Sequence, residues 1–486
     1  MAMPAICSSP GISYQEGKYV SIQSINPATG EVIETFEPFS EAQINEALDQ
    51  AHNTFREWRE TTFAERGALF HRLAGHLRDR KAELARMATL EMGKPIVESE
   101  AEVEKCAWNC DFYADNAEKF LADEHVATNA TDSYVSFQPL GVVLALMPWN
   151  FPYWQVIRFA APALMAGNTA VLKHASNVSR CALEIEKMFA ESGFPQGVFR
   201  TVLVPGAETG RLITDPRIAA VTLTGSDAAG VAVASTSGRV LKKNVLELGG
   251  SDAFIVLEDA DLDAAAQMAV RARYQNTGQS CIAAKRFIVV EAVADTFEQK
   301  FVEAASKLRV GDPLERETQI GPMARGDLRE ALEKQVRDSV EMGAKVILGG
   351  KLLAGKGYFY APTILSNVSL QMPVFREETF GPAAAVIRAR DTEHAVELAN
   401  DSQFGLGGNL WTGDIERGRK LARRLESGGV FINGMTASDP RLPFGGVKRS
   451  GYGRELSSFG IHEFVNIQTV WIGPAVNPEP VKTPSE

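Results

Sequence analysis

The sequence is poor in cysteine and histidine and has no long apolar run. Its five cysteines in 486 residues stand at positions 7, 106, 110, 181 and 281, too few and too irregular for a disulfide framework. The seven histidines form no H-E-x-x-H motif and no Cys/His cluster at metal-ligand spacing, so we expect no metal site. No apolar run approaches the ~18 residues of a membrane span, and residues 1–18 contain no signal-type hydrophobic stretch. These absences predict a cytoplasmic protein outside the membrane.

Basic residues are also fewer than acidic ones. Lys and Arg total 50 against 61 Asp and Glu, a net charge of −11, which disfavours a nucleic-acid partner. The 45% hydrophobic and 23% charged residues are ordinary for a soluble globular protein. At ~150 residues per domain, the length predicts about three domains.

Three common catalytic and nucleotide-binding motifs are missing. There is no G-x-x-x-x-G-K-[ST] phosphate loop, no G-x-S-x-G serine elbow and no strict G-x-G-x-x-G. ATP chemistry of the first type and an α/β-hydrolase serine are therefore unsupported. A dinucleotide, if bound, must be held in another way.

Hydrophobic periodicity predicts an α/β protein. Helices dominate the first hundred residues after a loose N-terminus: a capping box at Ser40 and Gln43 opens one, and others are expected over 64–92 and 99–121. The last of these is acidic on one face, which we interpret as a solvated surface. The tail after Pro474 is expected to be disordered.

After Gln138, strand-length apolar runs alternate with helical patterns, which predicts two parallel-sheet α/β domains with a seam at 248–250. The expected strands are 141–147, 169–174, 198–204, 218–224, 253–257, 287–290, 384–387 and 430–432. Helices are expected over 154–166, 178–192 and 227–237.

Cys281 is the cysteine best suited to chemistry. A lone cysteine is usually a small buried hydrophobe, and Cys106, Cys110 and Cys181 fit that interpretation inside helical patterns. Cys281, in contrast, follows the loop-like sequence Gly-Gln-Ser, with Lys285 and Arg286 nearby. Positive charge lowers a thiol pKa and favours the nucleophilic thiolate.

Two further polar residues end apolar strands. Glu247 precedes Gly249 and Gly250, and it is either a salt-bridge partner or a base that desolvation brings toward neutral pKa. Asn150 stands between two prolines, where it either closes a turn or donates a hydrogen bond to an oxyanion.

A nucleotide could bind where two predicted parallel strands end. Lys173 and Ser176 end one strand, and Gly225 and Ser226 end another before a helix. Ligands of open parallel sheets lie beyond such carboxyl ends, and a helix N-terminus attracts phosphate.

Five ordered motifs together resemble the aldehyde dehydrogenase superfamily, from about residue 25 to 471. They are Pro-Trp-Asn-Phe-Pro at 148–152, Glu-Leu-Gly-Gly at 247–250, Gly-Gln-Ser-Cys at 278–281, Glu-Thr-Phe-Gly-Pro at 378–382 and Pro-Phe-Gly-Gly-Val-Lys at 443–448. The 34-residue interval from Glu247 to Cys281 also fits the family.

The resemblance implies a division into three parts and a homodimer or homotetramer. The cofactor-binding domain would comprise 1–119 and 140–249, and the catalytic domain 250–449. A small β oligomerisation element would comprise 120–139 and 450–486.

The resemblance also implies a mechanism. Cys281 would attack an aldehyde, the Asn150 amide and the Cys281 backbone N–H would hold the oxyanion, and hydride would pass to a nicotinamide. Glu247 would activate the water that hydrolyses the resulting thioester on Cys281.

The cofactor-binding residues implied by the family lie at both strand ends and near the nicotinamide. They are Trp149, Lys173, Ser176, Gly225, Ser226, Glu378 and Phe380. Members that prefer NAD often place a glutamate where Ser176 stands. Because Ser176 beside Lys173 can accept a 2′-phosphate, we predict NADP as the preferred cofactor and NAD as a second one.

Three further motifs look most like the bacterial succinate-semialdehyde dehydrogenase branch: Trp-Gln-Val-Ile-Arg at 154–158, Leu-Lys-His-Ala-Ser-Asn at 172–177, and the segment that runs from Asn-Gly at 433–434 to Ser-Asp at 438–439. Arg158, eight residues after Asn150, and Ser438 match that branch's carboxylate-binding residues. Some members carry a second arginine where this chain has Gln275, so a single arginine leaves room for other aldehydes.

Other functions stay open at this point. Another short-chain or aromatic aldehyde is the main rival substrate, and a CoA-acylating relative would lack the base that Glu247 supplies. A non-redox cysteine hydrolase would need His174 or His462 beside Cys281. A non-catalytic structural protein would not need the Cys281, Glu247 and Asn150 set.

Overall fold

The computed structural model describes residues 14–15, 18–19 and 21–473. Cys7, most of the N-terminus expected to be loose, and the tail after Pro474 lie outside these residues. The described chain opens with two small antiparallel pairs, β1 (Tyr14–Gln15) with β2 (Lys18–Tyr19) and β3 (Ile22–Ile25) with β4 (Val32–Phe36). Four helices follow: α1 (Glu41–Trp58), α2 (Phe63–Asp79), α3 (Lys81–Met92) and α4 (Ile96–Phe120).

The helix starts follow from capping residues. Ser40 and Gln43 form the expected capping box at α1, and Thr62 forms another with Glu65 at α2. The single helix expected over 64–92 is wrong, because α2 and α3 are separate. Arg80 between them leaves helical geometry, with φ −99° and ψ 13°, and periodicity alone does not register so brief a break.

The first large sheet contains the strands expected after Gln138. These are β7 (Val142–Met147), β8 (Thr169–His174), β9 (Phe199–Thr201), β10 (Ile218–Thr224) and β11 (Lys243–Glu247), joined by α5 (Trp154–Met165), α6 (Ser179–Glu191), α7 (Thr209–Thr214) and α8 (Asp227–Arg239). The spatial order β11-β10-β7-β8-β9 is parallel throughout, and β21 (Gly451–Tyr452) adds an antiparallel edge strand beside β11. The order reverses beside β7, which is where ligands of such sheets bind.

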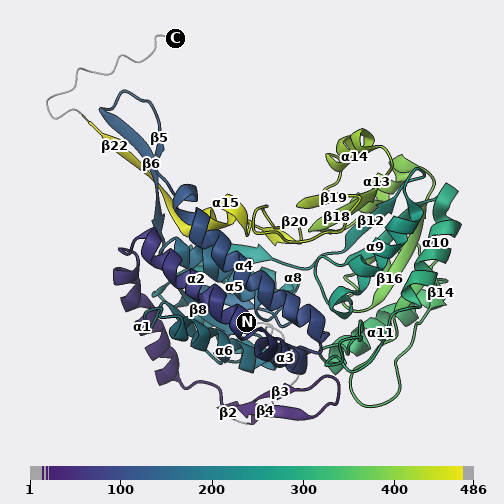
Figure 1. Ribbon diagram of the computed structural model, residues 1–486, viewed down its shortest axis with the longest axis horizontal. Coiled ribbons are helices and arrows are strands. Elements are labelled where there is room, and N and C mark those ends of the chain that lie inside the picture. Colours follow the sequence, from purple (N-terminus) through teal and green to yellow (C-terminus); the bar gives the residue numbers. More distant parts are fainter. Residues whose placement is uncertain (1–13, 16–17, 20, 474–486) are drawn as a thin grey trace.

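The second sheet has seven strands in the order β14-β15-β16-β13-β12-β18-β19, with only β14 antiparallel. Its strands are β12 (Asp252–Val256), β13 (Ala284–Val290), β14 (Lys345–Leu348), β15 (Thr363–Ser366), β16 (Ala383–Ala389), β18 (Gly407–Trp411) and β19 (Gly429–Ile432). The helices of this half are α9 (Leu262–Tyr274), α10 (Glu291–Ala305), α11 (Gly326–Glu341), α12 (Pro373–Arg376), α13 (Thr392–Asn400) and α14 (Ile415–Ala422). Residues 248–250 link the two sheets, as expected. The result is the two-sheet α/β fold expected from the sequence (Figure 1).

A third, three-stranded antiparallel sheet projects from the body of the molecule (Figure 1). It consists of β5 (Glu124–His125), β6 (Asp132–Pro139) and β22 (Val465–Ile472), in the order β22-β6-β5. The short pair β17 (Phe404–Gly405) with β20 (Val447–Lys448) and helix α15 (Ser457–Ile461) complete the C-terminal part. Among the described helices, none combines the length and apolarity that crossing a membrane requires.

Candidate active site

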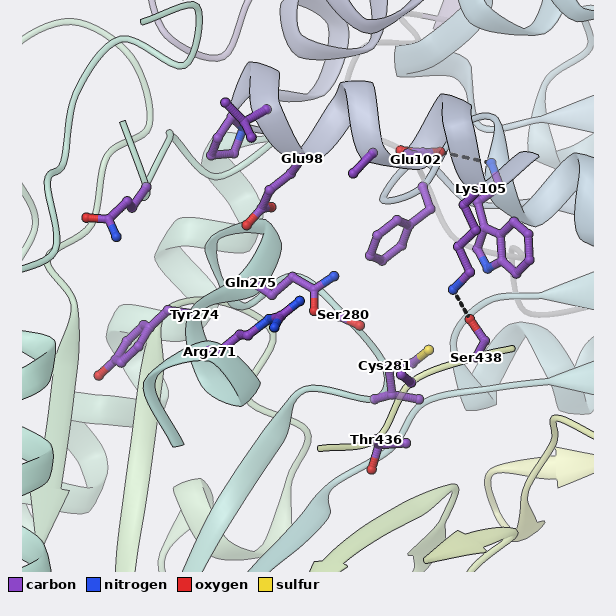
Figure 2. A pocket seen from close by; sticks show the side chains of 18 of the residues that line it. Glu98, Glu102, Lys105, Arg271, Tyr274, Gln275, Ser280, Cys281, Thr436 and Ser438 are labelled. Atoms are coloured by element: carbon purple, nitrogen blue, oxygen red, sulfur yellow. Dashed lines mark hydrogen bonds between the residues drawn. The ribbon is translucent and has the colours of Figure 1, made fainter. Parts of the chain in front are cut away.

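A cavity of about 670 Å³ opens beside Cys281. Helices α4 and α5 line it on one side, and the end of α9, the Cys281 loop and the segment 436–444 line the other. Figure 2 shows α4 crossing above the cavity, with Glu98, Glu102 and Lys105 on the same helix. The predicted residues Arg158, Gln275, Cys281 and Ser438 all line this space.

The Cys281 loop has a tightly held left-handed turn before the cysteine. Asn276, Thr277 and Gly278 have φ values of +55°, +56° and +71°. Gly278 is required here, because an added Cβ would lie 2.3 Å from the carbonyl oxygen of Gly381. The buried guanidinium of Arg273 donates to the Gly278 carbonyl at 2.7 Å and to the Ala284 carbonyl at 3.0 Å. Such strain persists only where the surroundings fix it, as they do before this nucleophile candidate.

Lys285 forms hydrogen bonds to the backbone of the same loop. The sequence placed it near Cys281; it lies in β13, fully buried, and its ammonium donates to the carbonyls of Ser280 (2.9 Å), Cys281 (2.8 Å) and Ala283 (3.2 Å). It also lies 3.5 Å from a carboxylate oxygen of Glu378. One buried cation thus ties the cysteine loop to the segment that carries Glu378.

Burial and nearby positive charges act on the Cys281 thiol in opposite directions. Burial raises its pKa to about 12, while the charges of Arg158 and Lys285 oppose that rise. The positive surroundings expected from the sequence are therefore present, but burial outweighs them. Attack on an electrophile requires that the thiol proton be taken up by a base.

Asn150 is anchored against the Cys281 loop. Its Nδ2 donates to the Gln279 carbonyl at 3.0 Å, its Oδ1 accepts from Gln155 at 3.1 Å, and its backbone carbonyl accepts from the Asn276 amide at 2.8 Å. An amide nitrogen carries two hydrogens, so one remains after the bond to Gln279.

Glu247 lies at the end of β11, only 2% exposed, with no hydrogen-bond partner for either carboxylate oxygen among the described residues. Burial and the neighbouring carboxylate of Glu455 raise its pKa well above the usual range. Glu455 in turn pairs with Arg158, which is 3% exposed and also donates to Thr224 at 3.3 Å. The charge of Glu247 also raises the pKa of the Cys281 thiol.

The residues expected around the nicotinamide form a second group. Gly250 donates its backbone N–H to Glu378 at 3.0 Å, and an added Cβ at Gly249 would lie 2.4 Å from the same carboxylate. Burial raises the pKa of Glu378, and Lys285 opposes that rise. The Trp149 and Phe380 rings pack edge to face with centroids 5.7 Å apart.

The residues expected at the nucleotide follow parallel strands at one edge of the first sheet. Ser226 caps α8, accepting from the Ala229 N–H, directly after Gly225 and β10. Lys173 and Ser176 come at the end of β8. Burial lowers the pKa of Lys173 to about 8, and no described carboxylate lies within ion-pair distance of it. An unpaired, partly buried cation at this edge suits an anionic ligand.

Three residues on α4 that line the cavity were not predicted as site residues from the sequence. The acidic face expected to be solvated is partly buried, so that interpretation is wrong. Glu102 pairs with Lys94 and accepts the N–H groups of Tyr153 (2.8 Å) and Trp154 (2.9 Å), which caps α5. Glu98 accepts the Asn276 N–H at 2.7 Å, and burial raises its pKa to about 7. Lys105 donates to Ser438 at 2.7 Å. Periodicity groups these residues on one helix but does not indicate what covers them.

The two histidines named for a hydrolase are engaged elsewhere. His174 is buried, its Nε2 lies 2.9 Å from the Pro152 carbonyl, and its Nδ1 accepts from the Ala175 N–H at 2.9 Å. His462 Nδ1 lies 2.5 Å from the Ser458 carbonyl and its ring packs against Phe137. None of the residues that line the cavity beside Cys281 is a histidine.

Known proteins match the chain along almost its whole length. A model of the aldehyde dehydrogenase family matches residues 14–470. An NADP(+) succinate-semialdehyde dehydrogenase from Mycobacterium avium is 52% identical over 456 residues, covering 93% of this chain and 97% of that protein. An NAD(P)+ succinate semialdehyde dehydrogenase from Escherichia coli is 52% identical over 448 residues, covering 92% and 97%. The crystal structure of succinic semialdehyde dehydrogenase from Streptococcus pyogenes in complex with NADP+ has a TM-score of 0.91 at 37% identity, covering 93% of this chain and 100% of that chain.

Proposed function

Because the chain belongs to the aldehyde dehydrogenase family, we propose that it oxidises succinic semialdehyde to succinate, with NADP preferred and NAD as a second cofactor. The relatives from M. avium and E. coli carry this substrate in their names. The observation that carries the proposal is the cavity beside Cys281. In it a nucleophile shares one space with a hydroxyl and basic side chains that can bind a carboxylate.

Cys281 is the proposed nucleophile. Its S–H proton leaves to water in the open cavity, the sulfur of the resulting thiolate forms a bond to the aldehyde carbon, and the electron pair of the C=O bond moves to the oxygen, giving the oxyanion of a thiohemiacetal. The second N–H of the Asn150 amide and the Cys281 backbone N–H hold that oxyanion. Preorganised donors of this kind stabilise developing charge strongly, since they need no reorganisation during the reaction.

The described residues fit a dinucleotide with a 2′-phosphate. Lys173 supplies an unpaired ammonium beside Ser176, and Gly225 with the capped start of α8 suits a pyrophosphate. Glu378 and Phe380 are the residues that we propose would bind the nicotinamide ribose and pack beside the nicotinamide ring. NADP held there would supply the acceptor for the hydride of the thiohemiacetal carbon.

Glu247 is the proposed base for hydrolysis of the thioester on Cys281. Its carboxylate oxygens accept no hydrogen bond from any residue that the structure describes, and its raised pKa makes it a stronger base than an exposed glutamate. It takes a proton from water as the water oxygen attacks the thioester carbon. The C–S bond then breaks, releasing the carboxylic acid and the cysteine.

A panel of aldehydes tests the substrate. We expect kcat/KM for succinic semialdehyde to exceed that for butanal by roughly tenfold or more, since butanal lacks the carboxylate that the polar groups would bind. The measurement is the absorbance of reduced cofactor with each aldehyde and with NADP or NAD. A preference for butanal or for an aromatic aldehyde would overturn the substrate proposal, and no signal with any aldehyde would overturn the activity.

A Ser176→Glu variant tests the cofactor preference. We expect the ratio of kcat/KM for NADP to that for NAD to fall roughly 10- to 100-fold, because a carboxylate repels a 2′-phosphate and binds free ribose hydroxyls. Ser176→Gln is the matched control, since it adds the same bulk without charge. An unchanged ratio in the Glu variant would contradict the role of Ser176.

The proposal extends to organisation and location. We assign cofactor binding to 1–119 with 140–249, catalysis to 250–449 and oligomerisation to 120–139 with 450–486, in a homodimer or homotetramer. Exposed Ile467 and Trp471 on β22 support an interface at the projecting sheet, although β21 pairs with β11 in the first sheet. The four described cysteines are free thiols, which suits the cytoplasm.

The hydrolase alternative lacks support in the cavity. A cysteine hydrolase needs a base beside its nucleophile, and both named histidines are held elsewhere. Glu247 is a base suited to the hydrolysis of a thioester in the oxidative reaction.

A further inference from the structure

Lys105 on α4 meets Ser438 at the wall of the cavity. Its Nζ lies 2.7 Å from the Ser438 Oγ and 4.3 Å from the centre of the Trp154 ring. Both residues line the same space as Cys281. Figure 2 shows the Lys105 ammonium directed at Ser438, on the same side of the cavity as the Cys281 sulfur.

The charge of Lys105 has no counter-ion among the described residues. Two other basic groups that line the cavity are paired, Arg158 with Glu455 and Arg316 with Glu100 at 2.8 Å, whereas Arg271 lines it as an exposed side chain without an ion pair to a described residue. No described carboxylate lies within ion-pair distance of the Lys105 ammonium, although the side chain is largely withdrawn from water. A desolvated cation without a partner is unfavourable, and an anionic ligand would supply the partner.

The hydrogen bonding leaves suitable donors free. An ammonium carries three N–H groups, and Lys105 uses one on the oxygen of Ser438. Two N–H groups and the Ser438 O–H remain, enough to reach both oxygens of one carboxylate. Arg158 is less available, since Glu455 and Thr224 already take up its guanidinium.

We propose that Lys105 binds the carboxylate of the aldehyde substrate together with Ser438, and so selects aldehydes that carry a second, anionic end. This assignment rests on the proposed oxidation of succinic semialdehyde. It makes Lys105 a specificity residue, while the reaction at the aldehyde carbon stays with Cys281.

The surroundings of Lys105 make this recognition sensitive to pH. Burial and the charge of Arg158 on α5 lower its pKa to about 8, while Glu102 and Cys106 on α4 and Asp439 in the facing loop oppose the shift. The ammonium is therefore charged below about pH 8 and neutral above it. Affinity for the carboxylate should fall as the pH rises through that value.

Four variants test the assignment with succinic semialdehyde and butanal. In Lys105→Met we expect KM for succinic semialdehyde to rise roughly 10- to 100-fold, the value of a charge-assisted hydrogen bond, with kcat/KM for butanal nearly unchanged. Lys105→Arg should restore most of the preference. Lys119→Met, on the exposed last turn of α4, should behave as wild type. Arg271→Met removes an exposed cation that lines the same cavity and should have a small effect.

The outcomes distinguish a failure of the Lys105 assignment from a failure of the proposed function, the oxidation of succinic semialdehyde. A wild type that does not prefer succinic semialdehyde overturns the proposed function. A wild type that prefers it, with a Lys105→Met variant that loses both aldehydes equally or neither, overturns the role of Lys105. A selective loss in Arg271→Met instead would move carboxylate binding to Arg271.

The pH profile is the readout that a merely structural lysine would not change. For the wild type, KM for succinic semialdehyde should climb above about pH 8, whereas KM for butanal should not. In Lys105→Arg the climb should vanish, because arginine stays charged. A climb that persists in the arginine variant would contradict the assignment.

Discussion

Replacing Cys281 with alanine is expected to abolish aldehyde-dependent formation of NADPH, with kcat lower by roughly 10³-fold or more. Cys281 is the described cysteine that lines the cavity, whereas Cys106, Cys110 and Cys181 are buried in α4 and α6. Without its sulfur, no group on this wall can form the thiohemiacetal from which hydride leaves. The measurement is the steady-state rate at saturating aldehyde and NADP.

Cys110→Ala is the matched control for that variant. It removes a thiol whose pKa burial raises far from any reactive range, deep in α4. We expect wild-type kcat and a modest loss of thermal stability from the smaller buried side chain. A Cys281→Ala enzyme with near wild-type kcat would exclude covalent catalysis at this residue.

The thiol pKa adds a check on the same cysteine. Because burial raises the Cys281 pKa to about 12, the thiolate fraction grows about tenfold per pH unit across the neutral and alkaline range. The rate of inactivation by iodoacetamide, measured without cofactor, should follow that rise without reaching a plateau near neutral pH.

Replacing Glu247 with glutamine is expected to stop the reaction after its first half. One NADPH should form per active site in a burst, and the following steady rate should fall roughly 10²- to 10⁴-fold, the usual value of a general base. The amide keeps the shape of the buried side chain but cannot take a proton from water. Rapid mixing with absorbance detection measures both phases.

The sign of the pH effect follows from the raised pKa of Glu247. The base works only when deprotonated, so the steady rate of the wild type should rise with pH through that pKa, and the Gln variant should lose the rise. Glu463→Gln is the control, since Glu463 also raises the Glu247 pKa but pairs with Lys243 outside the cavity. It should show no burst. A uniform loss without a burst in Glu247→Gln would contradict a role in hydrolysis.

Local patterns predicted the strand ends that carry the site. The strands 169–174 and 218–224 appear as β8 and β10 with those bounds, because turn residues and apolar runs mark such elements within one stretch of sequence. Glu247 and Asn150 were found in the same way, as polar residues at the ends of apolar strands. A strand that ends in Glu-Leu-Gly-Gly can be recognised from the local sequence alone, without knowing what packs against it.

The sequence does not predict which residues far apart along the chain contact each other. Lys105 and Ser438 are 333 positions apart, and nothing in either segment indicates the other. The resemblance predicts Arg158 as a carboxylate-binding residue, but its pairing with Glu455 depends on how the C-terminal segment returns to the first sheet. Lys285 was expected merely near Cys281, whereas the fold buries it beneath three carbonyls of the loop.

The thioester on Cys281 is the species on which the proposed chemistry depends, and the Glu247→Gln enzyme should accumulate it. The measurement is the intact mass of that variant after mixing with succinic semialdehyde and NADP, followed by peptide mapping. We predict a mass increase of one succinyl group, located on the peptide that contains Cys281. An unmodified protein alongside continued formation of NADPH, or a succinyl group on another residue, would contradict the mechanism.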